Sequence, residues 1–324
     1  MKRILLLGAT GYIGQAFATE LSALNISFYA LSRKELDYTR FDFLLDHLKK
    51  NRPDFVINAA GYTGRPNVDA CETARAETLL GNTLFPQSLA QACLVAGIPY
   101  GHVSSGCIYT GAKVVENGQS RIEPDLTKPG LQALVQNELR ASHFGLHPSG
   151  VHGFTETDTP NFSFRSPPCS FYSGTKALGE EVMLPFGNGY LWRLRIPFDE
   201  INNPRNYLTK VQTYSKVYDN VNSISHRTDF VRACLDLWKL RAPFGIYNVT
   251  NPGWITTRHV IKQIERILKP GKSFAFWTDD AEFYKFAKAP RSNCVMDTSK
   301  LLNAGVKIRP VDEALDDSLK NWKA

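Results

Sequence analysis

Residues 4–14 have the sequence ILLLGATGYIG, an apolar run followed by three glycines with GxxGxxG spacing. Four apolar residues in a row are typical of a parallel strand that is covered on both faces. Gly8 permits a tight turn, Gly11 lets a phosphate approach the main chain, and Gly14 lets the following helix pack closely on the strand. The N-terminus of that helix attracts anions through its N–H groups and its dipole. The pattern therefore predicts a dinucleotide-binding turn at residues 8–14.

The same alternation of strands and helices continues beyond this turn. Strands are predicted at 27–31, 55–58, 100–104, 190–196 and 245–249, and helices at 12–24, 41–50, 76–96, 172–183 and 257–268. Strands separated by helices form right-handed βαβ units, so we expect an α/β fold with a doubly wound parallel sheet. Gly, Pro and Ser are frequent between 111 and 153, where only a short helix at 131–144 is predicted.

The composition is that of a globular protein. The 324 residues are 43% hydrophobic and 21% charged, which excludes wholesale disorder, and no apolar run approaches the roughly 18 residues of a membrane helix. The net charge of +7 is not clustered, which favours an anionic small molecule over nucleic acid as the partner. The apolar run at 4–7 is too short for a signal peptide, and no two of the six cysteines form a CxxC, so we expect a cytoplasmic protein without a bound metal.

The residues after the second predicted strand bear on the choice of cofactor. An acidic residue there selects the ribose hydroxyl of NAD, whereas the basic Arg33 and Lys34 favour the 2′-phosphate of NADP. A solvated loop is the alternative interpretation of this pair. The residues that we expect to contact the cofactor are Gly8, Thr10, Gly11, Tyr12, Ile13, Gly14, Arg33, Asn58, Ala59, Ala60, Gly61, Asn82, Tyr172, Lys176 and Arg195.

A YxxxK motif at Tyr172 and Lys176 supplies a candidate acid–base pair. Residues four apart lie on one face of a helix, and an ammonium near a phenol lowers the pKa of that phenol. The tyrosine then becomes a usable proton donor or acceptor near neutral pH. Ser105, which follows the fourth predicted strand, is placed to hydrogen-bond a substrate carbonyl oxygen.

Together these motifs resemble the extended short-chain dehydrogenase/reductase family over nearly the whole chain. The resemblance implies a Rossmann domain at 1–196 with 227–249, containing an insertion at about 112–152, and a smaller sugar-nucleotide domain at 197–226 with 250–324. It also implies a Ser–Tyr–Lys catalytic set, and a homodimer would be usual for this family.

Five further motifs, in one order, resemble the bifunctional 3,5-epimerase/4-reductases that complete UDP- or dTDP-rhamnose synthesis. They are AGYTGRPNVD at 60–69, GCI at 106–108, DTPNF at 158–162, NPRNYLTK at 203–210 and GIYNVTNPG at 245–253. In that family the residues matching Cys107 and Lys210 exchange the protons on C3 and C5 of a 4-keto-6-deoxyhexose nucleotide. Without the resemblance, Cys107 would be an ordinary buried thiol and Lys210 a surface charge.

The expected substrate contacts include arginines for a diphosphate and asparagines for sugar hydroxyls, with surface ion pairs and helix caps as their alternatives. The full set is Arg65, Ser105, Asn161, Phe162, Arg205, Asn206, Lys210 and Arg291. His143, His147 and His152 are close in sequence but are interpreted as loop residues. Three other functions stay open: a 4-reductase alone, an epimerase alone, and a non-catalytic regulatory subunit. Cys107 and Tyr172 lie 65 positions apart, farther than in the resembled enzymes, which leaves the exact sugar open.

Overall fold

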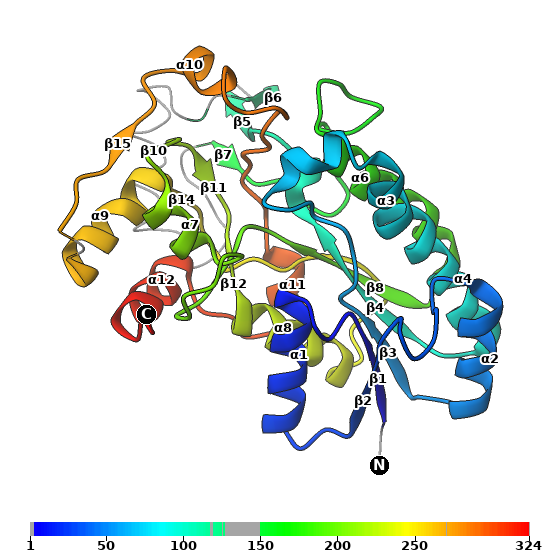
Figure 1. Ribbon diagram of the computed structural model, residues 1–324. Helices are drawn as coiled ribbons and strands as arrows, with labels where there is room; N and C mark the ends of the chain where they lie inside the picture. The colour runs from blue at the N-terminus through cyan, green and yellow to red at the C-terminus, as the bar shows by residue number, and fades with distance from the viewer. Residues whose placement is uncertain (1–2, 117–118, 125, 127–149, 270, 324) are drawn as a thin grey trace. The chain divides into compact units, whose positions relative to one another are not determined.

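The computed structural model describes residues 3–116, 119–124, 126, 150–269 and 271–323 (Figure 1). The chain forms two compact units, each assembled from three segments. Unit 1 contains Met1–Ile108, Pro160–Arg193 and Cys234–Tyr247, and unit 2 contains Tyr109–Thr159, Leu194–Ala233 and Asn248–Ala324. Among the described residues, no helix has the length and apolar character needed to cross a membrane.

Unit 1 is built on a six-stranded sheet with the strand order β13-β8-β4-β3-β1-β2. β1 pairs in parallel with β2 and with β3, and β3 pairs in parallel with β4. The predicted doubly wound sheet is confirmed, and its strands lie within a few residues of the predicted positions. They are β1 (Ile4–Leu7), β2 (Phe28–Leu31), β3 (Phe55–Asn58), β4 (Tyr100–Ser105), β8 (Gly189–Leu194) and β13 (Gly245–Asn248).

Helices cover both faces of this sheet, which explains the uninterrupted apolar strands. In Figure 1, α1 lies on one side of the sheet, and α2, α4 and α6 lie on the other. Between β3 and β4 the predicted helix at 76–96 is interrupted by one π-helical stretch. The helical elements of this unit are α1 (Tyr12–Ala23), α2 (Phe41–Asn51), η1 (Val68–Glu72), α3 (Arg75–Leu79), the π-helix η2 (Leu80–Leu84), α4 (Phe85–Ala96), η3 (Gly106–Ile108), α6 (Phe171–Met183) and η5 (Leu184–Phe186).

Two apolar layers hold unit 1 together. Leu44 and Leu48 of α2 pack with Leu89 of α4 against the strands on one face. On the other face, Phe17 of α1 stacks on Trp192 of β8 with ring centroids 5.9 Å apart. These contacts fix the carboxyl ends of the parallel strands, where ligands bind in open α/β sheets.

Unit 2 consists of short strand pairs and helices. Its core is formed by apolar faces of α7, α9 and α12, including Leu208, Val260, Ile264, Leu315 and Leu319. The helices are α7 (Tyr207–Thr213), α9 (Thr257–Leu268), α10 (Asp280–Tyr284), α11 (Ser299–Asn303) and α12 (Val311–Lys320), while α8 (Arg227–Lys239) begins in unit 2 and ends in unit 1. The strands are β5 (Ala112–Glu116), β6 (Gln119–Glu123), β7 (Val151–His152), β9 (Pro197–Phe198), β10 (Lys216–Val217), β11 (Val221–Asn222), β12 (Ser225–His226), β14 (Ile255–Thr256) and β15 (Ala275–Phe276).

The division into units differs from the expected one at residues 109–159. The sequence placed this segment in the nucleotide-binding domain, with residues of about 112–152 as an insertion, but its described backbone pairs within unit 2. Gly111 bridges Cys294, and Phe154 bridges Met296. Because unit 2 includes this segment, it is not the smaller of the two. The helix predicted at 131–144, together with His143 and His147, lies outside the described residues.

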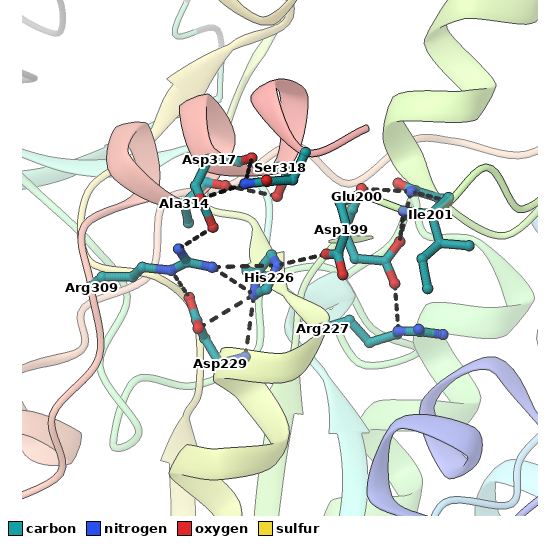
Figure 2. Close-up of polar contacts among 12 residues, drawn as sticks. Asp199, Glu200, Ile201, His226, Arg227, Asp229, Arg309, Ala314, Asp317 and Ser318 are labelled. Carbon is teal, nitrogen blue, oxygen red and sulfur yellow. Dashed lines mark hydrogen bonds and ion pairs between the residues drawn. The ribbon is translucent and has the colours of Figure 1, made fainter. Parts of the chain in front are cut away.

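A cluster of charged side chains surrounds His226 inside unit 2, at the start of α8 (Figure 2). The imidazole Nδ1 lies 3.3 Å from Asp229, and Nε2 lies 3.7 Å from Glu200. Arg309 binds Asp229 at 2.7 Å and Asp317 of α12 at 2.7 Å. These ion pairs connect β12, α8 and α12, so the cluster links three separate segments of unit 2.

Candidate active site

The glycine-rich turn between β1 and α1 has the geometry that its sequence predicts. Gly8 has a φ of +77°, and a Cβ there would lie 2.5 Å from the main-chain nitrogen of Ala60. A Cβ at Gly14 would lie 2.0 Å from the carbonyl oxygen of Gly8. Gly11 is the N-cap of α1, whose first turn carries no acidic residue and whose N-terminus has no side-chain cap. The turn therefore fits the pyrophosphate of a dinucleotide, because its backbone is open and the helix dipole is not neutralised.

The other residues predicted for the cofactor surround this turn in unit 1. Thr10 is exposed, Tyr12 and Ile13 are half-buried in the first turn of α1, and Arg33 is exposed just after β2. Asn58 is fully buried: its Oδ1 accepts a hydrogen bond from the Ala60 N–H at 3.0 Å. Asn58 thus shapes the 59–60 backbone that lies against Gly8.

Ser105 and Cys107 come together at the carboxyl end of β4. The Cys107 N–H donates a hydrogen bond to Ser105 Oγ at 3.1 Å. Ser105 is buried, whereas Cys107 is half-buried in η3. The Phe162 N–H donates to the Ile108 carbonyl at 3.0 Å, so Asn161 and Phe162 are anchored beside the same short helix.

Tyr172 and Lys176 lie on α6, as the YxxxK spacing predicts. Ser170 caps the helix by accepting a hydrogen bond from the Ser173 N–H at 3.1 Å, which fixes Tyr172 in the first turn. Lys176 Nζ donates to the Val103 carbonyl of β4 at 3.3 Å. Burial lowers the pKa of Lys176 to about 8, against the opposing effects of Glu180 and then Cys107. The lysine, the thiol and the end of β4 therefore form one cluster.

Asn82 joins this cluster from the π-helix η2. Its side chain binds the Tyr62 backbone twice, accepting from the N–H at 3.0 Å and donating to the carbonyl at 2.9 Å. A Cβ at Gly61 would lie 3.3 Å from Asn82 Oδ1 and 3.5 Å from Lys176 Nζ. Gly61, Asn82 and Lys176 thus meet, as expected for residues around a cofactor. The close neighbour of Gly174, by contrast, is the ring of Phe164, 2.3 Å from a Cβ built there.

Three residues that the sequence analysis did not single out form a buried network beside Lys176. Glu180 lies one turn after Lys176 on α6 and binds Arg193 of β8, with Oε2 at 2.7 Å from Nη2. Ser104 Oγ donates to Glu180 Oε1 at 2.5 Å. The spacing of Tyr172, Lys176 and Glu180, each four residues apart, was a signal that could have identified this face of α6.

Two of the predicted residues of unit 2, Asn206 and Lys210, belong to α7 and its N-cap. Asn206 is fully buried and caps the helix by accepting from the Leu208 N–H at 2.9 Å, while its amide donates to Asp199 and Ile201. These contacts occupy both the amide oxygen and the amide nitrogen, so Asn206 acts as a helix cap, which was the alternative to binding a sugar hydroxyl. Lys210 is half-buried one turn later, and burial, assisted by the charge of Arg205, lowers its pKa.

The arginines predicted to bind ligands have different surroundings. Arg195 is buried in unit 2 and donates to Asn222 and to the Ser292 carbonyl, which gives it a structural role there. Arg205 is half-buried, and its N–H donates to Asn203 Oδ1 at 2.9 Å. Arg291 is half-buried and donates to the Ala289 carbonyl at 3.2 Å, while Arg65 is exposed in unit 1.

Comparison with known proteins agrees with the predicted family. Residues 1–130 match the family described as RmlD substrate binding domain. The chain is 32% identical over 314 residues to a bifunctional dTDP-4-dehydrorhamnose 3,5-epimerase/dTDP-4-dehydrorhamnose reductase of Arabidopsis thaliana, covering 96% of this chain and 90% of the relative. It is 31% identical over 316 residues to a trifunctional UDP-glucose 4,6-dehydratase/UDP-4-keto-6-deoxy-D-glucose 3,5-epimerase/UDP-4-keto-L-rhamnose-reductase of the same plant. That match covers 97% of this chain but only 41% of the relative.

A solved structure supports the fold. The UDP-rhamnose synthase of Acanthamoeba polyphaga mimivirus superimposes with a TM-score of 0.80 at 22% identity, covering 98% of this chain and 99% of that one. With the GxxGxxG turn, the serine of β4 and the YxxxK of α6 in place, the chain belongs to the nucleotide-rhamnose synthases and dTDP-4-dehydrorhamnose reductases, NAD(P)-dependent enzymes of the extended short-chain dehydrogenase/reductase family.

Proposed function

We propose that this protein converts a UDP- or dTDP-linked 4-keto-6-deoxyhexose into a rhamnose-type sugar nucleotide, by epimerisation at C3 and C5 and reduction at C4. The observation that carries the proposal is the cluster of Ser105, Cys107 and Lys176 in unit 1. A reductase needs only the serine, tyrosine and lysine. Cys107, whose main-chain N–H donates to Ser105 Oγ, adds its half-buried thiol as a proton-transfer group at the same place.

The proposed chemistry follows from the acidity of the substrate. The C4 ketone acidifies the protons on C3 and C5, so a base on one ring face and an acid on the other can invert each centre. We assign these roles to Cys107 and Lys210, and the lowered pKa of Lys210 brings its ammonium closer to a neutral-pH proton donor. Ser105 and Tyr172 would hold the oxygen on C4 while negative charge develops there.

The reduction uses the same oxygen contacts. When bound, NAD(P)H would supply the hydride that reaches C4. Tyr172 would then protonate the oxygen, and the Lys176 ammonium, one helical turn away, would keep the phenol acidic enough to do so. One set of side chains could thus serve both the enolate and the alkoxide of the sugar.

The first experiment follows deuterium and cofactor together. Purified protein, NADPH and either nucleotide of 4-keto-6-deoxyglucose are incubated in heavy water, and the product is analysed by mass spectrometry. We expect deuterium at C3 and C5 and consumption of NADPH. With Cys107→Ser, the exchange is expected to fall by about two orders of magnitude, the size of a lost general base. Cys169→Ser, at the other half-buried cysteine, is the matched control.

The outcomes separate the alternatives. Consumption of NADPH without exchange would leave a 4-reductase, and exchange without consumption would leave an epimerase. If the protein still binds NADPH but turns over neither nucleotide sugar, the proposed reaction is rejected. That result would favour the alternative of a non-catalytic regulatory subunit.

We also propose that NADP(H) is preferred over NAD(H). Arg33 and Lys34 are exposed directly after β2, and the first acidic side chain that follows, Glu35, accepts hydrogen bonds from the Ser32 N–H at 2.8 Å and hydroxyl at 2.6 Å. The strand end is therefore basic, which suits a 2′-phosphate. Arg33→Ala should weaken NADPH binding about tenfold, the worth of one charged hydrogen bond, without affecting NADH. Equal weakening of both cofactors in a fluorescence titration would oppose this assignment.

A homodimer and a cytoplasmic location complete the proposal. Leu80 and Leu84 of η2 and Leu184 of η5 are 44%, 51% and 46% exposed, so the α6 side of unit 1 carries apolar side chains that a second copy could cover. Light scattering after gel filtration should give twice the chain mass, and Leu84→Glu should reduce it toward the monomer. A monomeric wild type would reject the dimer. None of the six cysteines, all of which lie in the described part of the chain, forms a disulfide, as is usual in a reducing compartment.

A further inference from the structure

Glu180 is a buried carboxylate on the same helical face as the candidate catalytic pair. It follows Lys176 by four residues, as Lys176 follows Tyr172, and side chains at this spacing are neighbours on a helix. Glu180 and Lys176 are both only 4% exposed. Two opposite charges that are buried together one turn apart interact much more strongly than the same pair would in water.

The carboxylate of Glu180 is held in one orientation from two strands. Arg193 of β8 binds it in a fork, with Nη2 at 2.7 Å from Oε2 and Nε at 3.1 Å from each oxygen. Ser104 of β4 donates to Oε1 at 2.5 Å. Ser104 stands between Val103, whose carbonyl accepts from Lys176 Nζ, and the candidate catalytic Ser105. Glu180 therefore contacts the strand that positions both Lys176 and Ser105.

The charge of Lys176 depends on this neighbour. Burial disfavours the ammonium and lowers the pKa of Lys176 to about 8, although Glu180 and then Cys107 oppose the effect. The other titratable neighbour, His102 of β4, has a pKa held well below its ordinary value by burial and by the charge of Lys176. A pKa this close to physiological pH leaves the lysine sensitive to the loss of one nearby negative charge, because an adjacent opposite charge is worth about one to three pKa units.

We propose that Glu180 is a positioning residue for the reaction: fixed by Arg193 and Ser104, its carboxylate keeps Lys176 in the ammonium form one turn from Tyr172. This inference rests on the proposed function, since it assigns Lys176 a role in the acidity of Tyr172. The competing role is purely structural, in which the Glu180–Arg193 ion pair only attaches α6 to β8. The two roles differ in their dependence on pH.

The test replaces the carboxylate by an amide of nearly the same shape. In Glu180→Gln the titration midpoint of Lys176 should fall by about one unit, the low end of the range for an adjacent opposite charge. At pH 7.5 the ammonium fraction then drops about threefold, whereas near pH 6 it hardly changes. We therefore expect kcat to fall about threefold at pH 7.5 and to be almost unchanged at pH 6. A structural role predicts a loss that is the same at both pH values.

Two readouts keep the test independent of the proposed reaction. The midpoint of Lys176 is measured directly by NMR of the protein labelled with 13C at lysine Cε, with the signal assigned by Lys176→Met, and the pH profile of kcat is measured in parallel. If the wild type does not turn over the 4-keto sugar, the proposed function fails, and the NMR midpoint alone decides whether Glu180 holds the charge of Lys176.

The control variants use neighbouring residues. Glu181→Gln removes the exposed carboxylate that pairs with Arg165 on the next position of the same helix, and it should leave both readouts unchanged. Glu180→Asp retains the charge and should restore most of the wild-type midpoint. If Glu180→Gln does not fold because Arg193 is left unpaired, Glu180→Gln/Arg193→Met is compared with Arg193→Met, so that the two variants differ only in the carboxylate. A Lys176 midpoint that does not change on loss of the carboxylate, in either comparison, would overturn the proposal.

Discussion

Gly14 offers a direct test of the nucleotide-binding turn, because a single added methyl group meets only main-chain atoms. In Gly14→Ala the new Cβ would lie 2.0 Å from the Gly8 oxygen, 2.7 Å from the Gly8 carbon and 2.9 Å from Ala9 Cα. Ordinary contact begins near 3.4 Å, so the turn and α1 must separate by more than about 1 Å. Overpacking of this kind costs about 1–3 kcal/mol, while alanine gains about 1 kcal/mol over glycine in a helix. Because the overlap is with main-chain atoms, we take the upper part of that range, about 2–3 kcal/mol, and expect a net loss of about 1–2 kcal/mol in the free energy of unfolding.

The same displacement should weaken the cofactor. A shift of about 1 Å misaligns the N–H groups of the helix N-terminus, and one charged hydrogen bond is worth about 1.5–3 kcal/mol, or roughly tenfold to hundredfold in affinity. Urea unfolding and a fluorescence titration with NADPH measure the two effects separately. Gly11→Ala, with one contact at 3.3 Å, should retain stability, and Gly97→Ala, with nothing within 4 Å but a φ of +69°, should lose about 1 kcal/mol and retain affinity. Wild-type stability and affinity in Gly14→Ala would refute this account of the turn.

Three further predictions concern pH, capping and packing. Burial disfavours a charged His226, but its contacts with the carboxylates of Asp229 and Glu200 outweigh burial and raise its pKa. This contribution to stability is therefore fully present below about pH 6.5 and is lost as the pH rises through the raised value. His226→Gln should abolish that decline in urea unfolding between about pH 6 and 8.5, and an identical slope in the variant would exclude His226 as its source. Asn206→Ala should cost about 2–3 kcal/mol, since it removes a helix cap and leaves buried carbonyls unpaired; a loss below about 0.5 kcal/mol in denaturant unfolding would contradict the observed cap. Gly174→Ala should change kcat by less than about threefold, because the half-exposed ring of Phe164 can rotate away; a larger loss would mean that a ligand approaches there.

Much of the fold could be predicted because its signals are local. The run at 4–14 specifies β1, the turn and α1 in eleven residues, and the strands that follow alternate with helices. Helices α8 and α12 were not predicted, although Val311, Leu315 and Leu319 recur every four residues and Phe230, Cys234 and Trp238 do the same. Their periodicity was available in the sequence.

Other features depend on contacts that local patterns do not contain. Residues 109–159 belong to unit 2 because Gly111 bridges Cys294 across more than half of the chain. The π-helical stretch at 80–84 likewise follows from tertiary contacts of Asn82 with Tyr62.

The candidate site shows the same limit. The spacing of Tyr172 and Lys176 predicts their shared face on α6, because helix geometry alone relates them. An asparagine before a helix, by contrast, suits a cap and a sugar hydroxyl equally well, and only the three-dimensional contacts of Asn206 distinguish the two. The proposed role of Glu180 could not be predicted from helix spacing alone either, because its partner Arg193 lies thirteen residues further along the chain, on β8.

The order of the strands has a consequence for the newborn chain on the ribosome. β1 to β4 lie within residues 4–105 and are synthesised in succession, but the neighbours that complete the sheet, β8 and β13, begin only at residues 189 and 245. Until β8 arrives, the backbone of β4 is an uncovered edge with the apolar side chains around it exposed, which is the arrangement that invites pairing with other chains. We expect nascent chains that end between β4 and β8 to need a chaperone.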